Sequence, residues 1–123
     1  AGLISYPPDP VYAAAKHGVI GFVRAMAPRL SGEQITVNAV CPGLTDTGML
    51  PASGREAIAR ERYPLLSAAD VASVVVGLLT GSGTGQALVC QPGREAVSYR
   101  FRNVPGPASG QAPPATLSKN GWV

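Results

Sequence analysis

Tyr12 and Lys16 stand four residues apart in the stretch VYAAAKHGVIGF, and both side chains can take part in proton transfer. In a helix, residues at this spacing lie on one face, one turn apart. An ammonium group close to a phenol favours the phenolate by Coulomb attraction, which suits a tyrosine that donates and accepts protons. The spacing therefore predicts acid–base chemistry on a substrate oxygen, with a tyrosine packed on a lysine stem as the simpler alternative.

The elements that must position this pair follow from the hydrophobic pattern. A helix is expected from Val11 or Tyr12 to Leu30, because its larger apolar residues recur close to every 3.6 positions. The β-branched run Ile35–Cys41 predicts a buried strand, and Pro42-Gly43 ends it. A short helix is possible at 54–62. A clear helix is expected over SAADVASVVVGLLT, where Ser67 and Asp70 have capping-box spacing, and a strand at QALVC. This order predicts an α/β fold with parallel strands.

Two parallel strands do not make a stable sheet, so the pattern indicates the second half of a larger domain. The elements of this pattern lie within residues 1–93. Residues 94–123 are rich in Pro, Gly, Ala and Ser, and we expect them to form a disordered C-terminal tail.

Composition limits the function classes. Ten basic and seven acidic residues give a net charge of +3 without any basic run, which predicts no nucleic-acid or membrane partner. No apolar stretch reaches transmembrane length and no signal-peptide pattern opens the chain. Cys41 and Cys90 lack metal-ligand spacing and His17 is the single histidine, so we expect no metal site. Reduced cysteines and a cytoplasmic location are the favoured interpretation.

Four ordered signals together carry a family resemblance. They are PVYAAAKHGVIGFVRA, ITVNAVCPGLTDTGM, AADVASVVVGLL and GTGQALVC. In this order the segments resemble the short-chain dehydrogenase/reductase family over about residues 1–91, with Lys-His-Gly and Cys-Pro-Gly most like its 15-hydroxyprostaglandin dehydrogenase branch. The resemblance implies that residues 1–93 are the C-terminal half of a doubly wound parallel-sheet (Rossmann-type) α/β domain. It also implies hydride transfer between a secondary alcohol or ketone and NAD or NADP, with NAD slightly favoured.

The resemblance also implies roles for single residues. Tyr12 would be the general acid/base, and Lys16 would bind the nicotinamide ribose and favour the tyrosinate. The cofactor would also meet the turn after the strand; the residues implied are Pro42, Gly43, Leu44, Thr45 and Thr47. Asn38 matches a family asparagine, for which a structural hydrogen bond is the favoured interpretation. His17 points off the Tyr12 face and is interpreted as a surface or packing residue rather than a catalyst.

Other family features are expected outside this sequence. The glycine-rich dinucleotide turn is absent, and GSGTG precedes a strand, so it is interpreted as a connecting turn. The position of the family's serine falls before Ala1, and Gln91-Pro92-Gly93 replaces its usual Asp-Gly-Gly turn. We therefore expect a fragment that is inactive alone. A non-catalytic remnant that dimerises through the Tyr12–Leu30 helix is the alternative, and a chain without a function of its own is a third.

Overall fold

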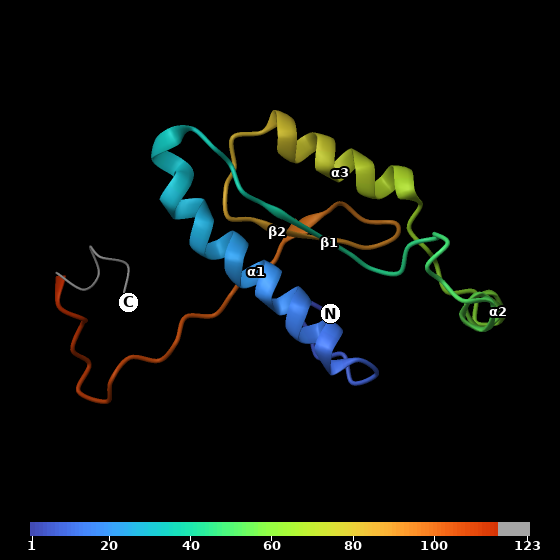
Figure 1. The fold of residues 1–123 in the computed structure, drawn as a ribbon, viewed down its shortest axis with the longest axis horizontal. Coiled ribbons are helices and arrows are strands. Elements are labelled where there is room, and N and C mark those ends of the chain that lie inside the picture. Colours follow the sequence, from blue (N-terminus) through green and yellow to red (C-terminus); the bar gives the residue numbers. More distant parts are fainter. Residues whose placement is uncertain (116–123) are drawn as a thin grey trace.

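The computed structural model describes residues 1–115 of the chain as a small sheet between helices (Figure 1). The elements in chain order are α1 (Pro10–Leu30), η1 (Ser31–Glu33), β1 (Ala39–Pro42), α2 (Ala52–Arg60), α3 (Ala68–Thr80), β2 (Ala87–Cys90) and β3 (Val97–Ser98). The mixed α/β fold expected from the sequence is confirmed, and the arrangement is that of part of a Rossmann-type domain.

Helix α1 begins two residues earlier than Tyr12, the later of the two predicted starts. Asp9 caps the helix, because its side chain accepts a hydrogen bond from the Tyr12 backbone N–H at 2.9 Å. Pro10 then occupies the first helical position, where its fixed φ is favourable and its missing N–H costs nothing. The cap fixes the start of the helix nearly two turns before Lys16, so the Tyr12 and Lys16 side chains both lie in the first two turns.

The sheet has the order β1-β2-β3 and leaves β1 at one edge of the described sheet. Strands β1 and β2 are parallel with Ala39 opposite Ala87, and α3 makes the crossover between them. The strand predicted at Ile35–Cys41 is shorter than expected, because its first residues are held by loop contacts rather than by a ladder. The edge of β1 carries backbone groups that a further strand could pair.

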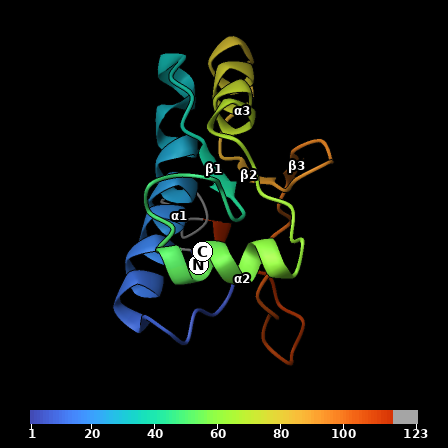
Figure 2. The ribbon, with the colours of Figure 1, turned by 90° about the vertical axis from the view of Figure 1, so that its right-hand side faces the viewer.

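Opposite faces of the sheet contact different helices (Figure 2). Ala39 and Ala87 point toward α1 and form the core with Ile20 and Val23. Side chains alternate along a strand, so Cys90 points toward α3 instead. Helix α2 lies beyond the carboxyl end of β1, on the side where α1 begins. This end of a parallel sheet is where ligands of doubly wound folds bind.

The prediction of a disordered tail is wrong for the residues that follow β2. Strand β3 (Val97–Ser98) pairs antiparallel with β2, and Tyr99 N–H donates to the Ala87 carbonyl at 2.8 Å. Phe101 packs against the core, with the Arg24 guanidinium 4.0 Å from its ring centroid. The aromatic contacts outweigh the polar composition that led to the prediction. The division at 93/94 stays a prediction, and the last part of the expected tail, 116–123, lies outside the described residues.

A helix that spans a bilayer needs about 20 consecutive, mainly apolar residues. Within residues 1–115, no helix is both long and apolar enough to cross a membrane.

Candidate active site

Tyr12 and Lys16 lie on one face of α1 at the carboxyl end of β1. The Lys16 ammonium nitrogen is 5.3 Å from the centroid of the Tyr12 ring, and the Tyr6 ring meets that ring edge-on at 5.8 Å between centroids. Both polar groups face a common space rather than the sheet core. The geometry keeps a cation next to a phenol, as the spacing predicts, and leaves the hydroxyl accessible to a ligand.

Gly2 holds the chain close to this part of α1. A Cβ atom added at Gly2 would lie 2.8 Å from the Lys16 carbonyl oxygen and 3.2 Å from the Ile20 side chain. A carbonyl of the helix backbone cannot move aside as a side-chain end can. The absence of a side chain at Gly2 therefore allows the first residues to pack against the turn of α1 that carries Lys16.

A groove of about 730 Å³ runs between the start of α1 and the sheet, a size typical of small-molecule sites. Tyr12 and Lys16 open into it, together with Pro42, Gly43 and Leu44 from the turn after β1. All four tyrosines of the chain line the groove; besides Tyr12 they are Tyr6, Tyr63 and Tyr99. The structure thus brings together five of the seven residues that the sequence singled out.

Gln91 is a groove residue that the sequence analysis did not assign to the site. The Gly43 N–H donates to the Cys90 carbonyl at 2.9 Å, which places the residues after β1 and β2 side by side. A Cβ at Gly43 would lie 2.5 Å from the Gln91 amide oxygen. The parallel register was the signal that could have found Gln91, because equivalent positions after neighbouring parallel strands meet at one sheet edge.

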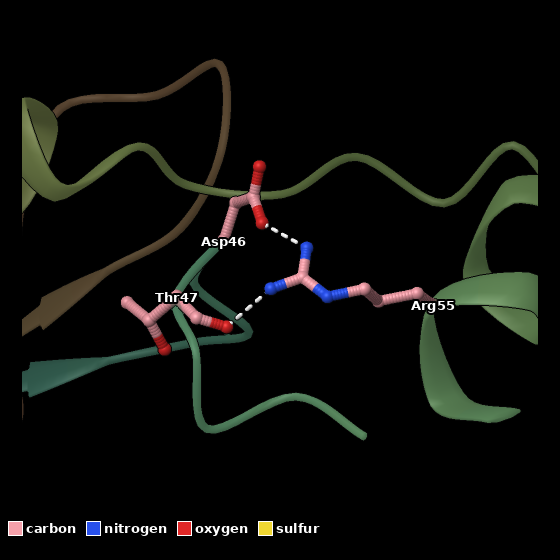
Figure 3. A network of polar contacts seen from close by, with 3 residues as sticks. All are labelled: Asp46, Thr47 and Arg55. Atoms are coloured by element: carbon pink, nitrogen blue, oxygen red, sulfur yellow. Dashed lines mark hydrogen bonds and ion pairs between the residues drawn. The ribbon is translucent and has the colours of Figure 1, made fainter. Parts of the chain in front are cut away.

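Thr45 and Thr47 follow the turn but do not line the groove. The Thr45 hydroxyl donates to the Gly43 carbonyl at 3.1 Å, and Thr45 forms a bridge with Leu66. The Thr47 carbonyl accepts from Arg55, whose guanidinium also pairs with the Asp46 carboxylate (Figure 3). The Thr47 side chain points away from that guanidinium. Its hydroxyl makes no hydrogen bond with the described residues 1–115.

Asn38 has a structural role, as the sequence analysis favoured. Its amide nitrogen donates to the Gly83 carbonyl at 2.8 Å, and its amide oxygen accepts from the Gln86 N–H at 3.0 Å. These two bonds join the segment before β1 to the turn before β2, which confirms GSGTG as a connecting turn. His17 is exposed and its Nδ1 contacts the Ala13 carbonyl at 2.9 Å.

Cys41 is a second groove residue outside the predicted set. Burial, and next the neighbouring Cys90 thiol, raise the pKa of Cys41, so the thiol form dominates at neutral pH. Cys41 faces α1 whereas Cys90 faces α3, and both are free. Cys41 therefore contributes an apolar wall to the groove rather than a nucleophile.

Comparison with known proteins decides the family. Residues 1–57 match the family model described as short chain dehydrogenase. Bovine (Bos taurus) 15-hydroxyprostaglandin dehydrogenase [NAD(+)] is 45% identical over 58 residues, which cover 46% of this chain and 22% of that enzyme. The Pseudomonas aeruginosa 3-oxoacyl-[acyl-carrier-protein] reductase FabG is 47% identical over 77 residues, 58% of this chain and 31% of that enzyme. A Penicillium rubens short-chain dehydrogenase/reductase is 33% identical over 87 residues, 70% of this chain and 30% of that protein.

The chain is a partial member of the short-chain dehydrogenase/reductase family. It spans less than a third of the length of each of these relatives. The matched residues include the whole Tyr12–Lys16 helix and the turn after β1, so the family assignment rests on the segment that forms the candidate site.

The groove suits the nicotinamide end of the cofactor that the family uses. Lys16 supplies a cation that can donate to ribose hydroxyls. Gly43 lets the Gln91 side chain pack against the turn, because the Gln91 amide oxygen lies 2.5 Å from the place where a Cβ would stand. The groove walls are otherwise mainly apolar, as a nicotinamide ring requires. The donor set thus suits one half of a dinucleotide, and the described residues offer no glycine-rich phosphate turn for the other half.

Proposed function

We propose that this chain carries the catalytic half of an NAD(P)-dependent oxidoreductase that interconverts a secondary alcohol and a ketone. The observation that carries the proposal is the shared groove, in which the Lys16 ammonium lies 5.3 Å from the Tyr12 ring beside the Pro42-Gly43-Leu44 turn. Tyr12 and Lys16 are the proposed catalytic pair. Lys16, the turn residues Pro42, Gly43, Leu44 and Thr45, and Thr47 are proposed to contact the cofactor, for which NAD is slightly favoured.

The reaction divides between these groups. In the direction of reduction, the Tyr12 hydroxyl gives its proton to the carbonyl oxygen of the ketone. In the direction of oxidation, the Tyr12 phenolate takes the proton of the alcohol. The Lys16 charge stabilises that phenolate and holds the ribose. A bound nicotinamide cofactor supplies or accepts the hydride.

An activity test of this proposal needs the glycine-rich phosphate turn, which this sequence does not contain. A chimera would join the residues of P. aeruginosa FabG that precede its match to this sequence directly to Ala1. Reduced nicotinamide would be followed by absorbance with a panel of secondary alcohols and ketones. Turnover is expected, and Tyr12→Phe should lower kcat by at least about 100-fold, a typical contribution of general acid–base catalysis.

Tyr6→Phe is the matched control, because it removes a phenol hydroxyl from the same groove. It keeps the Tyr12 hydroxyl and the ring that packs edge-on against Tyr12. It should leave kcat within about threefold of the parent. An equal loss for both variants, or turnover that survives Tyr12→Phe, would contradict the assigned role. The 123-residue chain alone is expected not to bind NADH in a fluorescence titration, since the phosphate-binding turn is missing.

An exposed apolar stripe on α1 favours a second candidate, a non-catalytic remnant that forms a homo-oligomer. Phe22 is 62% exposed and Val19 52% exposed, although other residues of the same helix, Ile20 and Val23, lie in the core. Exposed apolar surface of this kind suits an interface between copies. Size-exclusion chromatography with light scattering tests it: a dimer that Phe22→Lys separates supports the remnant, and a monomer excludes it.

For the substrate and the location, we propose only a class of molecule and a compartment. Leu44 and Tyr63 add apolar surface at the α2 end of the groove, which suits an alcohol or ketone on an apolar chain. A small-molecule substrate, with neither nucleic acid nor membrane as a partner, fits the weak net charge. We also propose a cytoplasmic location, which the free thiols of Cys41 and Cys90 support.

A further inference from the structure

The guanidinium of Arg55 joins α2 to the loop that follows β1 (Figure 3). One of its terminal nitrogens contacts the Asp46 carboxylate, and the other contacts the Thr47 carbonyl. A planar guanidinium can hold two acceptors in one fixed geometry, which an ammonium cannot. The two acceptors belong to adjacent residues, so the contact defines the path of the backbone through Asp46 and Thr47.

Both acceptor residues are also held by the backbone. The Asp46 N–H donates to the Leu66 carbonyl at 2.8 Å, which ties the loop to the residue just before α3. The Thr47 carbonyl accepts from the Leu50 N–H at 3.2 Å in addition to Arg55. The loop is therefore fixed on one side by the fold, and Arg55 supplies the connection to α2 on the other side.

The contacts of Arg55 with the Asp46 carboxylate and the Thr47 carbonyl, called the clamp below, leave the Thr47 hydroxyl free to bind a ligand. Arg55 takes the carbonyl of this residue, and the side chain points to the opposite side of the loop. The clamp atoms are partly exposed, with side-chain exposures of 42% for Arg55 and 58% for Asp46. Such a contact adds little to global stability. Its effect is expected to be local, on where the Thr47 hydroxyl lies.

We propose that Arg55 is a positioning residue that holds Thr47 in place for the cofactor and couples this loop to α2. The inference rests on the proposed function, in which Thr47 contacts the cofactor. Arg55 itself touches neither cofactor nor substrate.

The first test uses the 123-residue chain without any nucleotide. Hydrogen exchange of the Asp46 and Leu50 amides would be measured for the parent, Arg55→Ala and Arg55→Lys. Arg55→Ala should speed exchange at both amides by about three- to tenfold, and Arg55→Lys should lie between, since it can hold only one acceptor. Arg60→Ala is the matched control on the same helix, because within residues 1–115 the one ion pair of Arg60 is with neighbouring Glu61 at 3.8 Å.

The second test measures NADH and NADPH affinity in the FabG chimera by fluorescence titration. Arg55→Ala should weaken binding by about three- to tenfold and raise KM for the cofactor, with kcat changed less than twofold. Parent-like exchange in Arg55→Ala overturns the clamp, and parent-like affinity overturns its link to the cofactor. A parent chimera that folds but binds neither nucleotide contradicts the proposed function, and with it this inference, whatever the exchange result.

Discussion

Asn38 provides the sharpest quantitative prediction, because its two hydrogen bonds join segments far apart in sequence. Asn38→Ala removes the donor to the Gly83 carbonyl and the acceptor of the Gln86 N–H. Each hydrogen bond contributes about 1 kcal/mol net to stability. A fully buried partner left without a bond costs about 1–3 kcal/mol more, and the partners here are half-buried, so only part of that cost applies. The free energy of unfolding should fall by about 2–3 kcal/mol.

Urea unfolding followed by circular dichroism measures this loss. The midpoint should move to lower urea while the slope stays the same, since the surface exposed on unfolding does not change. Asn103→Ala is the matched control, because Asn103 is exposed and makes no hydrogen bond among the described residues 1–115. A loss below about 0.5 kcal/mol for Asn38→Ala, equal to that of the control, would refute a structural role for the bridge.

Asn38→Asp separates the two bonds. The carboxylate can still accept from the Gln86 N–H, but it places a negative oxygen against the Gly83 carbonyl, which is 2.8 Å from the present amide nitrogen. This variant should be at least as unstable as Asn38→Ala at neutral pH. It should recover part of its stability as the pH falls, because the protonated carboxyl can donate to that carbonyl. A variant unaffected by pH would contradict the assigned amide orientation.

Three further outcomes are expected. Gly2→Ala should destabilise the chain by about 1–3 kcal/mol, as measured by urea unfolding, because its Cβ would meet the Lys16 carbonyl oxygen. Hydrogen bonds from the Ser67 hydroxyl and N–H lower the pKa of the Asp70 carboxyl. The stability that the Asp70 carboxylate contributes is therefore complete above the ordinary pKa of an aspartate and is lost as the pH falls below that value. Asp70→Asn should make the free energy of unfolding less dependent on pH over that acidic range. Burial raises the pKa of Cys90, so iodoacetamide should label it slowly at neutral pH until denaturant is added, as read by mass spectrometry.

Local signals in the sequence were sufficient where one helix face or one cap decided the structure. The apolar spacing predicted α1 to within two residues of its observed bounds. The spacing of Ser67 and Asp70 predicted the start of α3, where the two residues form reciprocal hydrogen bonds. The Tyr12–Lys16 pair was visible for the same reason, because both residues lie on one helix and their spacing alone sets their distance.

Contacts between distant segments were not visible in the sequence. Strand β3 has two residues, and its pairing with β2 depends on Tyr99 and Phe101 finding the core. Gln91 enters the groove through the register of β1 and β2, and Arg55 reaches the loop after β1 from a helix with few apolar residues. Each of these depends on where a side chain ends in space, which composition and periodicity do not encode.

The proton-transfer role of Tyr12 is the central claim, and one comparison tests it most directly. In the chimera with the N-terminal residues of FabG, oxidation of a secondary alcohol would be followed by the absorbance of reduced nicotinamide for the parent, Tyr12→Phe and Tyr6→Phe. The account predicts turnover in the parent and in Tyr6→Phe, with kcat at least about 100-fold lower in Tyr12→Phe at unchanged cofactor affinity. Turnover by Tyr12→Phe at the parent rate would contradict it.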